Sequence, residues 1–115
     1  MNKKRILSGA QPSGLLHIGN YFGMIERMID FQDSSDLFCF IANYHSLTSI
    51  SNKQELEKNT FNAFSDLLSL GLDSKKSTVW VQSHVPAVTE LTWILSNFTS
   101  VGLMQRSTSY KDKVA

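Results

Sequence analysis

A short apolar segment leads directly into a turn rich in glycine, proline and serine, and an amphipathic helix follows the turn. Residues 5–9 have the character of a β-strand, and the turn contains the run Gln-Pro-Ser-Gly at 11–14. We expect a helix over residues 17–32, whose first turn carries an imidazole, a glycine and an amide. A tight turn that opens a helix directs backbone N–H groups at an anion. The sequence therefore predicts a nucleotide-binding turn between residues 8 and 21.

The order of strand and helix is repeated twice more along the chain. Residues 36–43 are almost uniformly apolar, and residues 78–82 form a third strand candidate. A strand that is apolar on both faces is typical of the interior of a parallel sheet covered by helices. The expected order is βαβαβα. The fold class is therefore α/β, with a Rossmann-like parallel sheet.

The second and third helices have clear start signals. We expect the second helix to begin at Ser51 or Asn52, with Glu55 as a capping-box partner, and to end near Gly71. The third helix is expected to begin at Pro86. Helical spacing predicts the core-facing side chains, which are Ile18, Phe22, Ile25, Met28 and Ile29 in the first helix, Phe61, Phe64, Leu67 and Leu68 in the second, and Leu91, Ile94, Leu95 and Phe98 in the third.

The chain's three histidines each follow one of the predicted strands. His17, His45 and His84 lie in the segments that leave the three strands. Because parallel strands end at the same edge of a sheet, we expect all three to approach one edge, where ligands bind in open α/β folds. A histidine just after a strand is also commonly a hydrogen-bonded loop residue. That alternative is weakest for His17, which lies beside glycines in the first turn of a helix.

Composition restricts the class of protein. A chain of 115 residues with 42% hydrophobic and 18% charged residues is of the size of one domain and is too apolar for a disordered segment. The formal net charge of +1 provides no general basic field for nucleic acid. Cys39 lies within an apolar run and is expected to be a buried thiol. No secretory signal or membrane span is evident, which predicts a reduced, cytoplasmic protein.

Four separate segments carry a resemblance to a known family. Gln-Pro-Ser-Gly at 11–14 with His-Ile-Gly-Asn at 17–20 resembles the first signature of class I aminoacyl-tRNA synthetases, in the form found in tryptophanyl-tRNA synthetases. The asparagine at position 20 favours the tryptophan branch over the tyrosine branch. Further matches follow in order at residues 43–48, 82–86 and 106–113. Four matches in order make the resemblance far more specific than one.

The resemblance implies the activation of tryptophan by ATP, followed by transfer of tryptophan to tRNA(Trp). The substrate carboxylate attacks the α-phosphate, so the protein mainly positions groups and stabilises charge. The catalytic residues implied are His17 and Asn20. ATP, supplied with Mg²⁺ as a co-substrate, would contact Gln11, Pro12, Ser13, Gly19 and Asn20. No tightly bound cofactor and no metal site of the protein's own are expected.

The resemblance also implies partners. Tryptophan would contact Leu7, Gly9, Gln11 and His45. Arg106, Lys111 and Lys113 are candidates for contacts with tRNA or within a homodimer, although a solvated helix face is the simpler interpretation. Leu103, Met104 and Gln105 stand where acidic residues are common in bacterial members of the family, so the local contacts are expected to differ.

The largest departure from the family is the absence of a Lys-Met-Ser-Lys-Ser segment. Residues 1–115 are expected to form the N-terminal half of a Rossmann-like catalytic domain, without its second half or an anticodon-binding domain. We therefore expect these 115 residues alone to activate tryptophan poorly or not at all. Two other functions remain open: another nucleotidyltransferase with a His-Ile-Gly signature, or a non-catalytic paralogue that binds nucleotide or a protein partner.

Overall fold

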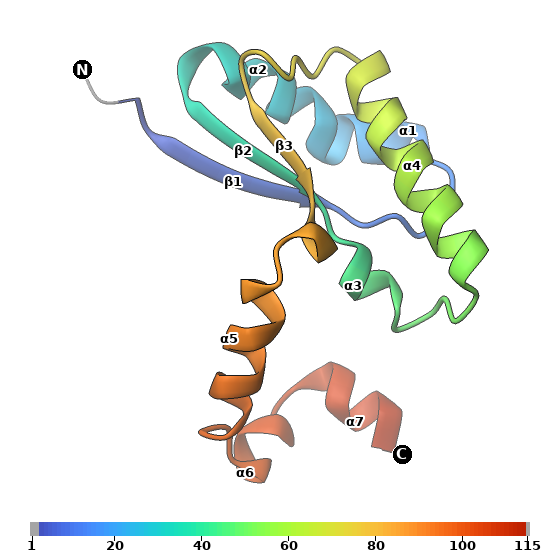
Figure 1. Ribbon diagram of the computed structural model, residues 1–115, viewed down its shortest axis with the longest axis vertical. Coiled ribbons are helices and arrows are strands. Elements are labelled where there is room, and N and C mark those ends of the chain that lie inside the picture. Colours follow the sequence, from blue (N-terminus) through green and yellow to red (C-terminus); the bar gives the residue numbers. More distant parts are fainter. Residues whose placement is uncertain (1–2, 115) are drawn as a thin grey trace. The chain divides into compact units, whose positions relative to one another are not determined.

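The structure, a computed structural model, describes residues 3–114 and divides into two compact units (Figure 1). The first unit extends to His84 and the second begins at Val85. Each unit is described by itself below. No helix within residues 3–114 has the length and apolar character needed to cross a membrane.

The first unit is built on a three-stranded parallel sheet, which confirms the predicted α/β class. Its strands β1 (Arg5–Ala10), β2 (Asp36–Ile41) and β3 (Thr78–Val81) lie in the order β1-β2-β3. Strands β2 and β3 end earlier than expected, because the backbone turns at once into the short helices α3 (Asn43–Ser46) and η2 (Gln82–His84). All three strands end at one edge of the sheet, as the sequence predicted.

The helix predicted over residues 17–32 is present as three consecutive segments. Helix α1 (Ile18–Asn20) passes into a π-helical turn, η1 (Tyr21–Ile25), and then into α2 (Glu26–Ser34). A π turn rotates the side chains before it relative to those after it. The predicted stripe is therefore correct from Ile25 onwards and wrong before it: Ile25 and Met28 are buried, whereas Ile18 and Phe22 are exposed. Tyr21, Met24 and Leu16 pack against the core in their place.

Helix α4 (Lys53–Ser69) begins and ends as the sequence indicates. The Asn52 side chain accepts a hydrogen bond from the Glu55 N–H at 3.0 Å, and Gly71 has a φ of +117° just after the helix. The predicted core face is half right. Leu67 is buried and Phe64 packs against the core, but Phe61 and Leu68 are exposed. Ala63 is buried one turn before Leu67. The buried face of α4 therefore includes Ala63 and is rotated about the helix axis relative to the predicted face.

Helices α2 and α4 cover the same face of the sheet. Residues of both helices share one buried cluster with Leu37, Cys39 and Ile41 of β2. Cys39 is a buried free thiol, as predicted. Its burial raises the pKa of the thiol to about 11. Crossovers between parallel strands are right-handed as a rule, and two successive crossovers in the order β1-β2-β3 then place their helices on one side of the sheet. The other face of the sheet is not covered by a helix of the first unit within residues 3–84.

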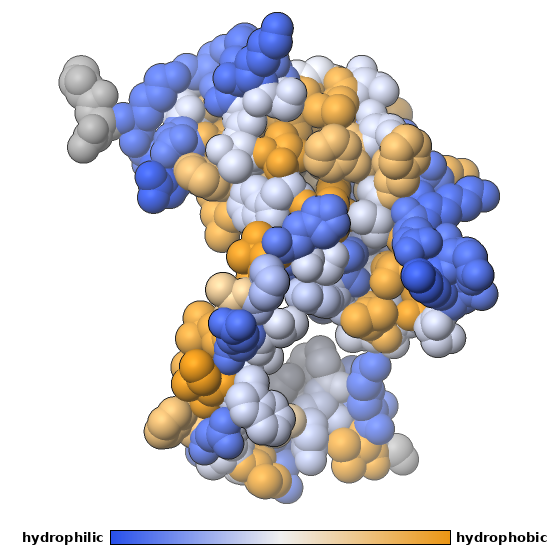
Figure 2. Space-filling view, viewed as in Figure 1, coloured by the Kyte–Doolittle hydropathy of each residue, from blue (hydrophilic) through white to orange (hydrophobic). Residues whose placement is uncertain are grey.

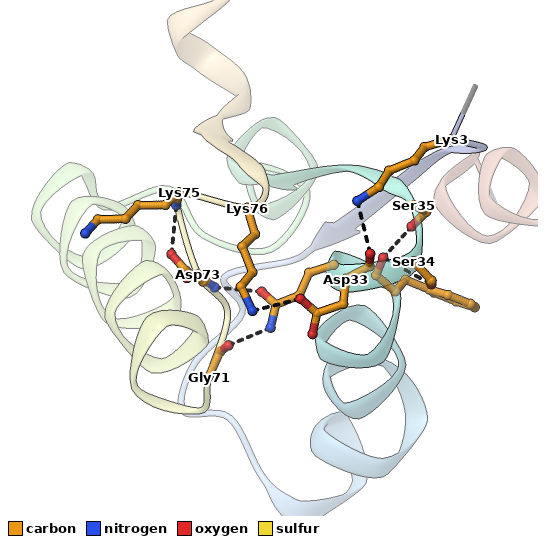
Figure 3. Close-up of polar contacts among 10 residues, drawn as sticks. Lys3, Asp33, Ser34, Ser35, Gly71, Asp73, Lys75 and Lys76 are labelled. Atoms are coloured by element: carbon orange, nitrogen blue, oxygen red, sulfur yellow. Dashed lines mark hydrogen bonds and ion pairs between the residues drawn. The ribbon is translucent and has the colours of Figure 1, made fainter. Parts of the chain in front are cut away.

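A buried glutamine joins the end of α2 to the turn that precedes β3. The Gln32 amide donates to the Gly71 carbonyl at 3.0 Å, and its oxygen accepts from the Asp73 N–H at 2.8 Å. Figure 3 shows Gly71 and Asp73 in this turn. An unpaired buried amide costs about 1–3 kcal/mol, so this pair of bonds fixes where the third strand begins.

The second unit contains helices α5 (Ala87–Ser96), α6 (Val101–Met104) and α7 (Thr108–Val114). Helix α5 begins after Pro86, as predicted. None of the described residues in these three helices is buried. The expected core face of the third helix is therefore wrong, since Leu91, Ile94, Leu95 and Phe98 are all exposed. Figure 2 shows hydrophobic side chains at the surface of α5.

Candidate functional site

The carboxyl edge of the sheet carries the residues that the sequence analysis singled out. Strands β1, β2 and β3 end there, and the segments that leave them contain His17, His45 and His84, all of which are exposed. The elements α3 and η2 are joined by Asn43. Its amide donates to Ser83 Oγ at 2.8 Å and accepts from the Ser83 N–H at 3.1 Å. His45 and His84 thus stand on linked elements, while His17 makes its polar contacts within its own turn.

The turn after β1 has one anchor and two accessible side chains. Pro12 is fully buried, whereas Gln11 is half-buried and Ser13 is exposed. The Ser13 N–H donates to the Gln11 carbonyl at 3.0 Å. Gly14 follows with a φ of +141°, a conformation that favours glycine. The turn therefore offers Gln11 and Ser13 to a ligand and holds them in place through Pro12.

His17 and Asn20 cap the first helical turn reciprocally. The Gly19 N–H donates to His17 Nδ1 at 3.1 Å, and the His17 N–H donates to Asn20 Oδ1 at 2.9 Å. A ring nitrogen that accepts a hydrogen bond carries no proton, so a neutral His17 bears its proton on Nε2. The exposed ring therefore presents an Nε2–H donor.

Gly19 makes this cap possible. A Cβ at position 19 would lie 3.0 Å from the His17 ring, at Cε1 and Nδ1. Gly19 was predicted only as a contact of ATP, and its contact with the imidazole was missed. The spacing of His17 and Asn20, three residues apart, matches a capping box and was the signal for this contact.

Of the residues predicted for tryptophan, Leu7 and Gly9 lie on the face of the sheet opposite α2 and α4, Gln11 directly follows β1 and His45 lies in α3. Gly9 pairs with Phe40, and Phe40 pairs with Trp80, so the three lie on one face. The Phe40 and Trp80 rings stack with centroids 5.5 Å apart. A Cβ at Gly9 would lie 2.7 Å from Phe40 Cζ, so any other residue at position 9 would require the Phe40 ring to move. Leu7 lies on the same face and is exposed.

The sequence pattern did not predict that Phe40 and Trp80 share a sheet face with Gly9. The period-two alternation of side chains along β2 would have separated Phe38 and Phe40 from the buried Leu37, Cys39 and Ile41. That signal was hidden because all of these residues are apolar.

The basic residues of the second unit are not gathered on one helix face. Arg106 follows α6, and Lys111 and Lys113 lie in α7. Side chains two residues apart on a helix point to different sides. The structure therefore places the lysines on one short helix without joining them into a single patch.

A parallel α/β sheet with a capped turn at its carboxyl edge defines the class of open α/β domains, which bind their ligands at that edge. The family model "tRNA synthetases class I (W and Y)" matches residues 1–115. The chain belongs to this family.

Relatives that match nearly the whole chain are tryptophan–tRNA ligases. Tryptophan–tRNA ligase of Fusobacterium nucleatum is 60% identical over 112 residues, covering 97% of this chain and 34% of the relative. Tryptophan–tRNA ligase of Campylobacter jejuni is 56% identical over 111 residues, covering 96% of this chain and 35% of the relative. The chain thus spans about a third of the length of these relatives.

Solved structures show the same fold. Tryptophanyl-tRNA synthetase of Campylobacter jejuni superposes with a TM-score of 0.90 at 55% identity, covering 98% of this chain and 35% of that one. A second structure of that enzyme, in complex with ADP and tryptophan, superposes with a TM-score of 0.89 at 55% identity, covering 96% of this chain and 34% of that one.

Proposed function

We propose that the protein containing this chain is a tryptophan–tRNA ligase. It activates L-tryptophan with ATP and transfers it to tRNA(Trp). The observation that carries the proposal is the capped turn after β1, in which His17 presents an Nε2–H donor beside a glycine and a helix start. The similarity to tryptophan–tRNA ligases over nearly the whole chain supports the choice of amino acid.

In this proposal, the turn binds ATP. Gln11 and Ser13 are accessible to the nucleotide, and Gly19 leaves room beside the His17 ring. The tryptophan carboxylate attacks the α-phosphorus, a P–O bond to the carboxylate forms, and the bond to pyrophosphate breaks. The His17 Nε2–H donates to a phosphate oxygen and stabilises the charge that develops there. Asn20 holds His17 through the backbone N–H and thereby positions the donor.

Tryptophan is proposed to lie at the open face of the sheet. Leu7 and Gly9 supply an apolar surface beside the Phe40 ring. Gln11 follows directly after β1, and His45 lies in α3 at the same edge. Aromatic and aliphatic surfaces suit an indole ring, which buries a large apolar area. The Campylobacter jejuni enzyme in complex with ADP and tryptophan supports the pairing of these two ligands.

The remaining partners follow from the proposed reaction. ATP enters as its Mg²⁺ complex, tRNA(Trp) accepts the tryptophanyl group, and the reaction takes place in the cytoplasm. We propose a homodimer whose interface includes α5, because α5 carries exposed Leu91, Trp93 and Ile94. Such apolar surface is typical of an interface between subunits. Arg106, Lys111 and Lys113 are proposed to contact tRNA or the second subunit.

The test is ATP–pyrophosphate exchange by the protein expressed from the complete reading frame that contains this chain. We expect exchange that depends on tryptophan, with tyrosine as the matched control and little exchange in its presence. Exchange stimulated by a different acid would instead identify another nucleotidyltransferase. ATP binding without pyrophosphate exchange, whichever acid substrate is added, would identify a non-catalytic paralogue. Either of these outcomes would overturn the proposed function.

A further inference from the structure

A second charged site lies at the opposite edge of the sheet, where the strands begin. A pocket of about 530 Å³ is lined there by Lys3, Arg5, Ser35, Asp36 and Lys76. Lys4 and Lys75 flank the pocket in the sequence. We call Lys3, Lys4, Arg5, Lys75 and Lys76 the basic edge.

The basic edge is held together by contacts between segments far apart in the chain. Lys76 Nζ lies 2.7 Å from Asp33 Oδ1, and Lys3 Nζ donates to the Asp33 carbonyl at 3.0 Å. Figure 3 shows Lys3 and Lys76 converging on Asp33. The hydrogen bond that Lys76 donates to the Asp33 carboxylate raises the pKa of Lys76. These contacts order the cations before any ligand arrives.

Arg5 is ordered in the same way from the neighbouring strand. Its Nε lies 3.1 Å from Asp36 Oδ2, and its guanidinium stands 5.0 Å from the centre of the Phe38 ring. The Arg5 side chain nevertheless remains 74% exposed. An ordered and accessible guanidinium is a preferred partner of phosphate.

Positive charge exceeds negative charge at this edge. The five cations of the basic edge face the carboxylates of Asp33, Asp36 and Asp73, and the two most direct ion pairs leave Lys3, Lys4 and Lys75 without a carboxylate partner in the described part of the chain. The formal charge of the whole chain is only +1. Together with these three carboxylates the basic edge carries a local charge of +2, and the remainder of the chain carries −1.

We infer that the basic edge binds the phosphate backbone of tRNA, away from the carboxyl edge where the amino acid is attached. This inference rests on the proposed function for the identity of the RNA. The two edges are separated by the length of β1, which has six residues, or about 20 Å at about 3.3 Å per residue. An RNA helix presents phosphates all along its length, so one arm can reach both edges. Lysine and arginine contacts of this kind supply affinity without reading sequence.

The test uses Lys4→Glu/Lys75→Glu, because neither side chain makes a hydrogen bond or ion pair in the described chain. The matched control is Arg27→Glu/Lys58→Glu, which makes the same change in net charge at exposed positions of α2 and α4. Binding of fluorescently labelled tRNA(Trp) transcript to the full 115-residue chain is measured by anisotropy across a series of salt concentrations. Urea unfolding of each variant verifies that the fold is retained.

We expect the basic-edge variant to bind tRNA at least about tenfold more weakly, and its plot of log affinity against log salt to be less steep by about 2. The control should change the affinity by less than about twofold. Equal effects of the two variants, or an unaltered chain that does not bind tRNA, would overturn the inference. Failure of tryptophan-dependent exchange in the longer protein would overturn the proposed function alone, because it leaves the difference between these variants unchanged.

Discussion

Replacing His17 with alanine is expected to lower tryptophan-dependent ATP–pyrophosphate exchange by about 10²–10³ in the protein expressed from the complete reading frame. The substitution removes the Nε2–H that the cap with Gly19 directs outwards. Tryptophan binding should change by less than about twofold, because the donor acts on the transition state and not on the amino acid. Exchange rates and equilibrium binding of tryptophan measure the two effects separately.

His17→Asn separates catalysis from capping. Asparagine is a good N-cap residue and can still accept from the Gly19 N–H, but it places no donor where His17 Nε2 stands. We expect this variant to keep the stability that His17→Ala loses, about 0.5–2 kcal/mol, and to be as slow in exchange as His17→Ala. Normal exchange by His17→Asn would remove the imidazole from the mechanism.

Leu67→Ala should lower the free energy of unfolding by about 2–5 kcal/mol. Leu67 is fully buried in the cluster that joins α4 to β2, so its loss leaves a cavity between helix and sheet. Urea unfolding, followed by circular dichroism, measures the change.

The adjacent leucine is the matched control. Leu68 is 39% exposed, although the sequence pattern placed both leucines on the core face. Leu68→Ala should cost less than half as much as Leu67→Ala, because fewer of its atoms lose contacts. Similar losses for the two variants would show that α4 is rotated relative to the structure described above.

The sequence was sufficient for the parallel sheet and the ends of α4 because their signals are local. Asn52 and Gly71 mark the ends of α4, and the spacing of His17 and Asn20 matches a capping box. Parallel strands after helical crossovers then follow from general rules of chain connection. The residues at the carboxyl edge were therefore identified correctly by position, although their contacts were not.

The remaining features depend on packing between distant segments. The π turn at Tyr21–Ile25 rotates the side chains of the first helix about its axis, and no residue type in the sequence predicts such a turn. Phe40 and Trp80 meet only because β2 and β3 are neighbours. The contact of Lys76 with Asp33 joins residues 43 positions apart. Sequence patterns of single segments contain no information on such pairs.

The central claim is that the turn after β1 binds the nucleotide. Titration of ¹⁵N-labelled chain with Mg²⁺–ATP, followed by NMR, tests it most directly. We predict that the amide signals with the largest shifts are those of Gln11, Ser13, Gly19 and Asn20. Shifts confined to residues of the basic edge, or no shifts when ATP is in large excess, would contradict the claim.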